Sequence, residues 1–293
     1  MTQNRTRAEH LQAATKAEVL VEALPWINKM SGKTFVVKYG GAAMEDRELC
    51  REVVKDLVLM YLIGVRLVLV HGGGKAINAL MKQLDVPVQF KDGLRVTDDA
   101  VMHVVQMALV GDVNQMLVSQ INAYGDIGVG VSGADGRTFE CRASDPALGR
   151  VGTIEKVNTK LVSEILDDGY IPVIASVGWG EDGAYNVNAD LAAAAMAKAL
   201  GADKLVYLSD VDGLFRDFSD RESLISRMTL DEMRDLIGSG SLERGMIPKM
   251  ASAADALEQG VRRVHFLNGT TPHSLLLEFL TNSGIGTMFL KEE

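Results

Sequence analysis

Lysines and glycine-rich turns at the ends of predicted strands suit this sequence to binding an anion. Lys38 follows the apolar run Phe35–Val37, which is typical of a fully buried strand, and Gly40 and Gly41 come shortly after it. A cation at the carboxyl end of a buried strand, beside backbone amides that no Cβ obstructs, can hold an anion. Because an unpaired ammonium there is costly, the stretch predicts an anion site.

A second strand-to-glycine turn repeats this arrangement. The apolar run Leu67–Val70 is followed by His71 and then by three glycines, Gly72–Gly74. In an open α/β sheet, ligands bind beyond the carboxyl ends of the strands, so both turns can face one anionic group. Each turn alone is equally explained as a tight connection to a helix. His71 is interpreted as a hydrogen-bonded structural residue rather than as a base.

Arg95 and Lys249 each stand at the start of a predicted helix. Arginine can bind a carboxylate through two parallel hydrogen bonds, although a surface ion pair of little energetic value would also explain Arg95. A cation at a helix N-terminus is disfavoured by the helix dipole, so Lys249 indicates a compensating anion nearby.

Asn186, Asn188 and Asp190 place two amides and a carboxylate around another helix start. Capping explains part of this pattern, since Asn188 is well placed as the N-cap. Asp190 is then free to hold a lysine in position.

Two nucleotide-binding patterns fail on their context. Gly32–Thr34 resembles the end of a P-loop, but Ile27 stands where the first glycine is required. The triplets within Gly128–Gly133 and Gly178–Gly183 have the spacing of a dinucleotide fingerprint. No helix follows the first triplet, and the helix after the second begins too late. A nicotinamide or flavin enzyme is therefore not predicted.

Composition narrows the class of protein. The net charge of −9 argues against duplex nucleic acid as a partner. Cys50 and Cys141 lack metal-ligand spacing and are expected to be reduced and buried rather than paired in a disulfide. No signal-peptide core precedes residue 10, and no apolar run approaches the roughly 20 residues that span a bilayer. We expect a soluble, cytoplasmic protein.

Strands and helices are predicted to alternate, which favours parallel βαβ units in an α/β fold. Pro25 predicts a break in the first helix, Thr97 is expected to cap the longest helix, and Asp135-Gly136 is expected to turn a hairpin. A lobe boundary is expected near Gly201. Residues 145–157 are expected to be rich in turns. The expected strands are 35–37, 67–70, 127–131, 137–142, 171–175, 204–208, 263–267 and 287–290, and the expected helices are 8–30, 45–62, 75–84, 97–124, 160–168, 188–200, 229–237, 249–260 and 272–280.

Together these features resemble the amino acid kinase family, and most closely its arginine-sensitive members that phosphorylate N-acetyl-L-glutamate. Each matching segment is short, but six in this order at these separations are highly specific. Lys75 departs from the pattern, since relatives often carry an uncharged residue there. The segments are Lys38–Gly41, His71–Gly74, Gly93–Thr97, Asn186–Asp190, Leu208–Gly213 and Gly245–Lys249.

The resemblance implies a three-layer αβα sandwich with a mainly parallel open sheet. Residues 1–30 would form an N-terminal interaction helix, residues 31–200 a lobe that binds N-acetyl-L-glutamate, and residues 201–293 a lobe that binds ATP with Mg²⁺. The implied reaction is ATP-dependent phosphorylation of the substrate's side-chain carboxylate to N-acetyl-L-glutamyl 5-phosphate, a step in arginine biosynthesis.

The resemblance also assigns roles to residues. Lys38 and Lys249 would stabilise the transferring phosphoryl group, Asp190 would orient both lysines, and no side chain is expected to bind a resident metal. The implied substrate contacts are Gly40, Gly41, Gly73, Gly74, Arg95 and Asn186. The implied nucleotide contacts are Ser209, Asp210, Val211, Asp212, Gly213, Leu214, Ser241, Leu242 and Glu243.

A carboxylate nucleophile is consistent with the residues present. Its reference pKa of about 4.3 leaves it ionised at neutral pH, so that no general base is required. Catalysis then consists of positioning and charge stabilisation. Two alternatives stay open, namely a kinase of a related acid, such as a carrier-linked aminoadipate or glutamate, and an arginine-binding regulator without catalytic activity.

Regulation by L-arginine is implied by the N-terminal helix and the C-terminal tail. Glu278 would meet the guanidinium, His265 belongs to the same pattern, and the backbone between Gly284 and Gly286 would bind the amino acid end. The alternative is that His265 and Glu278 are ordinary surface residues. The implied assembly is a homo-hexamer, a trimer of dimers joined through the N-terminal helices, although that helix can instead pack on its own domain.

Overall fold

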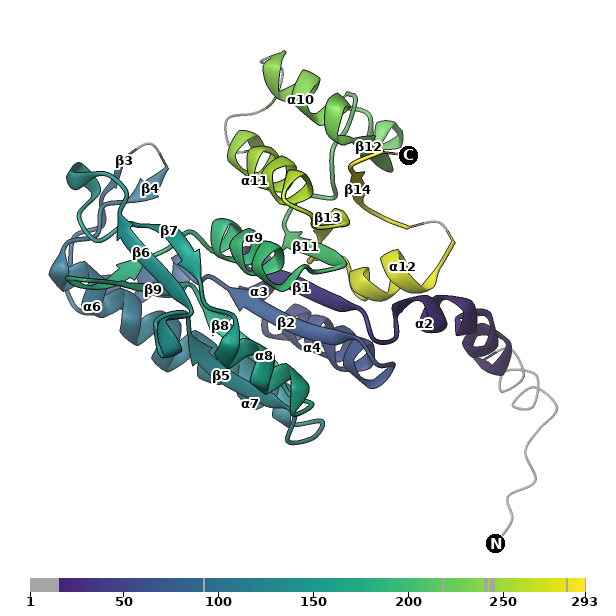
Figure 1. The fold of residues 1–293 in the computed structure, drawn as a ribbon, viewed down its shortest axis with the longest axis horizontal. Coiled ribbons are helices and arrows are strands. Elements are labelled where there is room, and N and C mark those ends of the chain that lie inside the picture. The colour runs from purple at the N-terminus through teal and green to yellow at the C-terminus, as the bar shows by residue number, and fades with distance from the viewer. Residues whose placement is uncertain are drawn as a thin grey trace, which may run out of the picture.

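The structure is a computed structural model that describes residues 16–91, 93–217, 219–239, 242, 246–282 and 284–292. An eight-stranded sheet runs through the molecule in the order β12-β14-β13-β11-β1-β2-β8-β5, with helices on both faces (Figure 1). All neighbouring strands are parallel except β13 and β14. The predicted αβα sandwich with a mainly parallel open sheet is confirmed.

The bounds of most predicted elements are confirmed to within a few residues. The main-sheet strands are β1 (Thr34–Tyr39), β2 (Arg66–His71), β5 (Gly128–Ser132), β8 (Ile171–Ala175), β11 (Lys204–Ser209), β12 (Arg227–Thr229), β13 (Arg263–Asn268) and β14 (Thr287–Leu290). The helices include α2 (Leu24–Met30), α3 (Ala42–Glu45), α4 (Arg47–Leu62), α5 (Gly74–Gln83), α6 (Asp99–Gln106), α7 (Asn114–Asn122), α8 (Lys160–Asp167), α9 (Ala189–Leu200), α10 (Leu230–Gly238), α11 (Met246–Glu258) and α12 (Ser274–Leu280).

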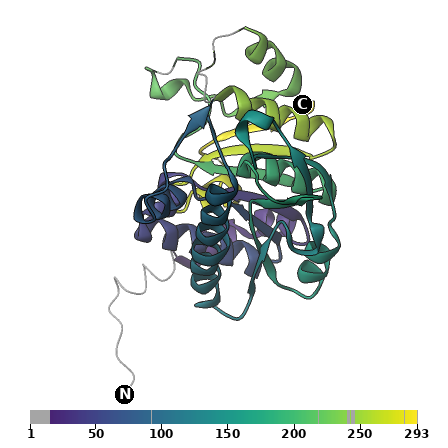
Figure 2. The same cartoon turned by 90° about the vertical axis from the view of Figure 1, so that its left-hand side faces the viewer.

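Alternate residues of the main strands face two separate cores. Val36 of β1 packs with α8, α9 and α11, whereas its neighbours Phe35 and Val37 pack with α4, α7 and α12. Viewed from the side, helices flank the central sheet (Figure 2). Burial on both faces explains why these strands read as continuous apolar runs rather than as alternating ones. The predicted lobe boundary at Gly201 falls between α9 and β11, and β11 pairs directly with β1.

The capping prediction for Thr97 is wrong. The helix begins at Asp99, and the side chain of Asp98 caps it by accepting a hydrogen bond from the Val101 amide at 2.8 Å. Thr97 is fully buried, and its hydroxyl donates to the carbonyl of Arg95 at 2.9 Å. The helix therefore starts one residue later than a Thr97 cap requires, and Asp98 supplies the capping oxygen.

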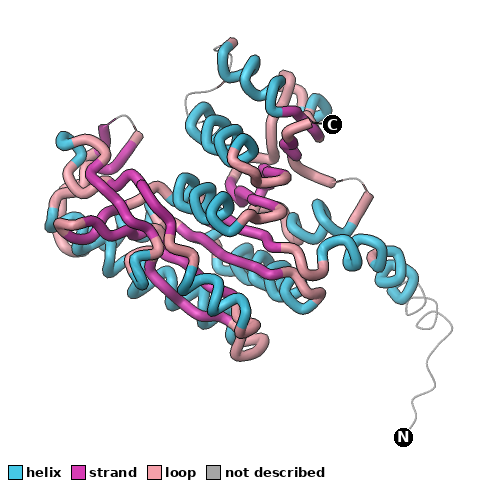
Figure 3. Tube along the Cα trace, in the orientation of Figure 1, coloured by secondary structure: helices cyan, strands magenta, loops and turns pink. Residues whose placement is uncertain are grey.

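The predicted hairpin at Asp135-Gly136 is also wrong. Residues Asp135–Arg137 form a short 3-10 turn that carries the chain out of the main sheet. The next strand, β6 (Phe139–Ala143), pairs with β7 (Gly152–Val157) and β9 (Val177–Gly180) in a second sheet (Figure 3), which β10 (Gly183–Asn186) completes. Strand β7 occupies a stretch expected to be rich in turns. Strands β9 and β10 pair with each other across the two residues between them, and β9 joins the rest of this sheet where Trp179 pairs with Glu140 of β6.

A break near Pro25 is confirmed within the part of the N-terminal helix that the structure describes. A helical segment that includes residues 16–22 is interrupted at Ala23, and α2 starts at Leu24 with Pro25 in its first turn. Helix α2 contacts α12. The first half of the predicted helix lies outside the described residues.

The longest helical stretch, Asp99–Asn122, is long and apolar enough to cross a membrane by length and composition alone. It carries Asp99 and Asp112, so it is not a continuous apolar run. Half of its apolar 18-residue window is buried inside the fold, which is typical of the core helix of a globular protein.

Candidate active site

Lys38 meets a carboxylate at the carboxyl end of β1. Its ammonium lies 2.8 Å from Asp190 Oδ1, and the two side chains are only 12% and 16% exposed. Asp190 is held at the start of α9 because the Asn188 side chain accepts hydrogen bonds from the amides of Asp190 and Leu191. Asn188 therefore acts as the predicted cap. The anion that compensates the lysine in this structure is the Asp190 carboxylate.

The pair opens into a cavity of about 260 Å³. Both glycine turns line this cavity, and their backbones lie close to neighbouring side chains. A Cβ added to Gly40 would lie 3.2 Å from the Lys38 ammonium, and one added to Gly72 would lie 3.2 Å from the Ala189 Cβ. The predicted residues that line the cavity are Lys38, Gly40, Gly41, Gly73, Gly74, Arg95, Asn186 and Asp190.

Arg95 enters the cavity from the small hairpin formed by β3 (Phe90–Lys91) and β4 (Leu94–Arg95). Its guanidinium is buried, donates to the Gly74 carbonyl at 3.1 Å, and lies 4.9 Å from the centre of the Phe90 ring. Burial lowers the pKa of Arg95 from its ordinary value. These contacts exclude the simple surface ion pair and leave a desolvated cation beside the cavity.

A hydrogen bond joins two of the predicted motifs. The Asn186 side chain donates to the Thr97 hydroxyl at 3.2 Å, and Thr97 donates in turn to the Arg95 carbonyl. Asn186 lies 89 residues from Thr97 in the sequence. The link therefore positions the hairpin that carries Arg95 relative to the start of α9.

Lys249 is not among the residues that line this cavity. It lies in the first turns of α11, one turn before Ser252. The Ser252 hydroxyl is 2.9 Å from the Tyr207 hydroxyl, which is 3.5 Å from the backbone carbonyl of Asp190. The beginning of α11 is thereby brought close to the beginning of α9. A meeting of Lys38 and Lys249 at one phosphoryl group stays a prediction.

The predicted nucleotide segment follows β11 and borders the first glycine turn, since a Cβ on Gly41 would lie 4.0 Å from the Asp210 amide. The Asp212 carboxylate accepts a hydrogen bond from Asn268 at 2.7 Å and lines a separate hollow of about 230 Å³. Gly213 has a φ of 148°, and a Cβ there would lie 2.5 Å from the Thr287 hydroxyl oxygen.

The other residues predicted to contact the nucleotide are less favourably placed. The side chain of Leu214 is buried in the core, and that of Leu242 packs against the same core, so only their backbones can face a ligand. The Leu214 amide donates to the Thr287 hydroxyl at 2.8 Å. Ser209 is buried at the end of β11, and Val211, two residues later, is partly exposed. Ser241 and Glu243 lie outside the described residues.

A buried relay occupies the predicted arginine site. The Lys204 ammonium lies 3.1 Å from His265 Nε2, and His265 Nδ1 lies 2.7 Å from a Glu278 carboxylate oxygen. The other oxygen of Glu278 accepts hydrogen bonds from the Ile285 and Gly286 amides, and Gly284 packs beside the same carboxylate. His265 is 2% exposed, so the alternative of ordinary surface residues is wrong.

Charge in this relay is set by burial. Burial lowers the pKa of His265 to about 4 and that of Lys204 to about 8. Burial alone would raise the pKa of Glu278, but the hydrogen bond from His265 and the two backbone amides lower it overall. At neutral pH the histidine is therefore neutral and lies between an ammonium and a carboxylate.

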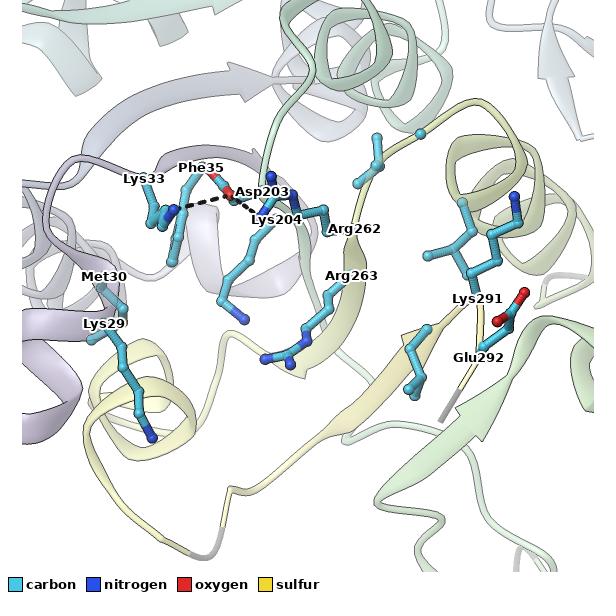
Figure 4. A pocket seen from close by; sticks show the side chains of 14 residues that line it. Lys29, Met30, Lys33, Phe35, Asp203, Lys204, Arg262, Arg263, Lys291 and Glu292 are labelled. Atoms are coloured by element: carbon cyan, nitrogen blue, oxygen red, sulfur yellow. Dashed lines mark ion pairs between the residues drawn. The ribbon is translucent and has the colours of Figure 1, made fainter.

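A cation-lined hollow of about 660 Å³ adjoins Lys204 (Figure 4). Asp203 forms ion pairs there with Lys33 at 3.8 Å and with Arg262 at 3.6 Å. Arg263 also lines the hollow. The positive charge around this hollow suits the carboxylate end of an amino acid better than it suits a guanidinium.

Acid is expected to destabilise this fold. Burial lowers the pKa of both His71 and His265 to about 4, whereas the ordinary value is 6.5. The unfolded chain therefore binds more protons between pH 6.5 and 4, so the free energy of unfolding falls as the pH drops through that window. Each histidine contributes a loss of up to about 1.4 kcal/mol per pH unit.

Urea unfolding at pH 7, 6 and 5 tests this expectation, with His265→Asn as the comparison. Asp56, whose pKa is raised by burial, acts in the opposite direction, and the variant comparison cancels its effect. The slope of unfolding free energy against pH should be shallower in the variant by about one histidine's share. Equal slopes in both proteins would contradict the proposed cause.

Two residues near the sites were missed by sequence reasoning. Asn268 ends β13 and holds Asp212, and Ser176 follows β8 and lines the cavity of Lys38. Both stand at the carboxyl end of a parallel strand, which is the pattern that identified the glycine turns. Applying that rule to every predicted strand would have found them.

Comparison with known proteins agrees with this architecture. The sequence profile of the amino acid kinase family matches residues 33–268. The acetylglutamate kinase of Thermoanaerobacter pseudethanolicus is 47% identical over 289 residues, covering 98% of this chain and 97% of that protein. That of Nostoc punctiforme is 46% identical over 292 residues, covering 99% and 98%.

Solved structures show the same fold. N-acetylglutamate synthase from Neisseria gonorrhoeae, complexed with coenzyme A and N-acetyl-glutamate, superposes with a TM-score of 0.83 at 29% identity, and 94% of this chain matches 64% of that longer one. Carbamate kinase from Giardia lamblia superposes with a TM-score of 0.65 at 17% identity, covering 90% of this chain and all of that one. The chain belongs to the amino acid kinase family.

Proposed function

We propose that this protein transfers the γ-phosphoryl group of ATP to the side-chain carboxylate of N-acetyl-L-glutamate, a step in arginine biosynthesis. The observation that carries the proposal is the Lys38–Asp190 pair, set at 2.8 Å in a cavity lined by two glycine turns and Arg95. The acetylglutamate kinases that match almost the whole chain support the same substrate.

The reaction brings one anion onto another, so charge stabilisation is its main requirement. The substrate carboxylate is ionised at neutral pH and attacks the γ-phosphorus directly, and ADP leaves with the former bridging oxygen. Lys38 would neutralise charge on the transferring group, and Lys249 would approach from the other side. Asp190 would keep the Lys38 ammonium in place between turnovers, and Gly41 and Gly73 line the same cavity.

The substrate would lie along the motifs that line the cavity. Arg95 and Asn186, which line the same cavity as Lys38, are proposed to bind its α-carboxylate. ATP would lie along Ser209–Leu214 and bring Mg²⁺ on its phosphates, an ion that commonly uses only one or two protein carboxylates. Among the residues that the structure describes, no cluster of three metal-binding side chains occurs.

Trapping the acyl phosphate with hydroxylamine tests the function. The purified chain, with ATP, MgCl₂ and N-acetyl-L-glutamate, should give the corresponding hydroxamate, with far less product from glutamate or aspartate. A preference for a different acid would overturn the substrate assignment. No ATP consumption with any acid would instead favour an arginine-binding regulator.

Arg95→Lys should mainly weaken substrate binding. An ammonium cannot reproduce two parallel hydrogen bonds to a carboxylate, so we expect the KM for N-acetyl-L-glutamate to rise about tenfold or more while kcat changes little. Steady-state kinetics at saturating ATP give both values. An unchanged KM would contradict a carboxylate-binding role for Arg95.

We also propose inhibition by L-arginine at the relay of Lys204, His265 and Glu278. Its support is the buried Glu278 carboxylate of lowered pKa, which His265 connects to Lys204 on the wall of the cation-lined hollow. Repeating the hydroxylamine assay with L-arginine should lower product formation. Equal product with and without it would remove this part of the proposal.

A homo-hexamer joined through the N-terminal helices, in the cytoplasm, completes the proposal. Apolar side chains on the described part of that helix are exposed, with Val19 at 59% and Leu20 at 71%. A run of exposed apolar residues is typical of a contact between subunits.

A further inference from the structure

The second glycine turn rests on two fully buried polar side chains. His71, the last residue of β2, is 0% exposed, and Asn114, the first residue of α7, is 1% exposed. Asn114 Nδ2 lies 3.0 Å from His71 Nε2, and it also donates to the Val173 carbonyl at 2.8 Å. Polar groups this deeply buried are costly unless their hydrogen bonds are satisfied, so the pair has a specific structural purpose.

These contacts select one form of the imidazole. Because Asn114 Nδ2 donates to a carbonyl, it is the amide nitrogen, and it donates to His71 Nε2 as well. Nε2 must then be the acceptor, which leaves the proton of the neutral ring on Nδ1. That Nδ1 lies 2.9 Å from the carbonyl oxygen of Gly72, to which it donates.

The hydrogen bond to Gly72 fixes the direction of the next amide. In a planar trans peptide, the carbonyl of one residue and the N–H of the next point in opposite directions. Holding the Gly72 carbonyl toward buried His71 therefore directs the Gly73 N–H away from it, on the side of the cavity that Gly73 lines. The Gly72 amide is held too, by donating to the Tyr39 carbonyl at 3.3 Å.

A π-helical segment brings Asn114 to this place. Residues Met107–Val113 are π-helical between α6 and α7, and such segments are rare and often occur at functional sites. Two of their side chains press on the turn, since a Cβ on Gly73 would lie 2.6 Å from Leu109 and 3.2 Å from Val113. Gly130 leaves the room for Asn114, because a Cβ there would lie 2.2 Å from its side-chain oxygen.

We infer that His71 and Asn114 are positioning residues, which orient the Gly73 amide toward the transferring phosphoryl group in the reaction proposed above. His71 touches neither substrate nor nucleotide in this role and exchanges no proton. Its task is to hold the Gly72 carbonyl, and the task of Asn114 is to hold the proton on His71 Nδ1.

Two variants of His71 separate this role from a merely structural one. In His71→Asn the side-chain amide stands near the position of Nδ1 and can still donate to Gly72, but it loses Asn114. In His71→Gln the side-chain oxygen can accept from Asn114, but no donor is left for Gly72. We expect His71→Asn to keep kcat within about threefold of wild type but to unfold at a lower urea concentration. We expect His71→Gln to unfold at a higher urea concentration than His71→Asn, but to lose about tenfold in kcat with an unchanged substrate KM.

A higher kcat in His71→Gln than in His71→Asn would overturn the inference. So would a kcat that simply follows the stability of each variant. A second measurement does not depend on activity. ¹⁵N NMR of histidine-labelled wild-type protein, with His71→Asn to assign the signal, should show His71 neutral and protonated at Nδ1 at pH 7. Protonation at Nε2 would overturn the inference even if the enzyme phosphorylates N-acetyl-L-glutamate, whereas a wild-type enzyme without that activity would refute the proposed function alone.

Discussion

Lys38→Ala is expected to lower kcat at least about a hundredfold. The largely buried Lys38 ammonium lines the cavity, where a fixed charge is more effective than in water, and loss of one well-placed stabilising donor costs roughly 3–4 kcal/mol. The substrate KM should change little, because the contact is strongest in the transition state.

The matched control for this variant is Lys198→Ala. Lys198, in the last turn of α9, also forms an ion pair, at 2.5 Å from Asp255, but it does not line the cavity. Its removal should leave kcat within about twofold. Circular dichroism and thermal unfolding of each variant separate a loss of chemistry from a loss of fold, since Lys38→Ala leaves Asp190 without its partner. Near-normal turnover in Lys38→Ala would remove the proposed mechanism.

Lys249→Ala is expected to cost about as much in kcat as Lys38→Ala, with a smaller effect on stability. No ion pair joins Lys249 to another residue within the described ranges, and its side chain is only partly buried. Its proposed function is therefore almost wholly in the transition state. Steady-state kinetics with saturating ATP and N-acetyl-L-glutamate measure the loss, and Lys156→Ala, an exposed lysine paired with Glu140, is the control.

The double variant gives the sharper result. If both ammonium groups neutralise one phosphoryl group, the free energy costs of the two substitutions should not add, because each lysine depends on the other's charge. Full additivity would indicate that Lys249 acts elsewhere, for example on ADP alone. Turnover of Lys249→Ala within a few-fold of wild type would exclude it from the reaction altogether.

The strands of the main sheet and most of its helices were predictable because their signals are local. Runs such as Phe35–Val37 and Leu67–Val70 are apolar over several residues, and Asn188 and Gly201 mark the two ends of α9 by side-chain capping and a left-handed backbone. The glycine turns were found because parallel strands end at one edge of a sheet, a rule that needs no knowledge of the partner strand.

Other features depended on groups far apart in the chain. Thr97 reads as a helix cap, but its hydroxyl bonds to Arg95 and accepts from Asn186, which lies 89 residues away. Strands β9 and β10 form a local antiparallel pair, and it is the place of β9 beside β6 that depends on a distant segment. The π-helical segment before Asn114 likewise has no pattern of its own, since it is packing around Gly73 and Gly130 that favours it.

The amino-acid order alone was sufficient to predict an α/β sandwich and an anion-binding edge, because both follow from short-range patterns of apolar residues and glycines. It could not show how near Asp190 lies to Lys38, that Arg95 is desolvated, or that His265 is buried rather than exposed. Those properties depend on how segments separated by many residues lie against one another and how much solvent they exclude. They arise only when the chain packs, and they set the charges on which the chemistry depends.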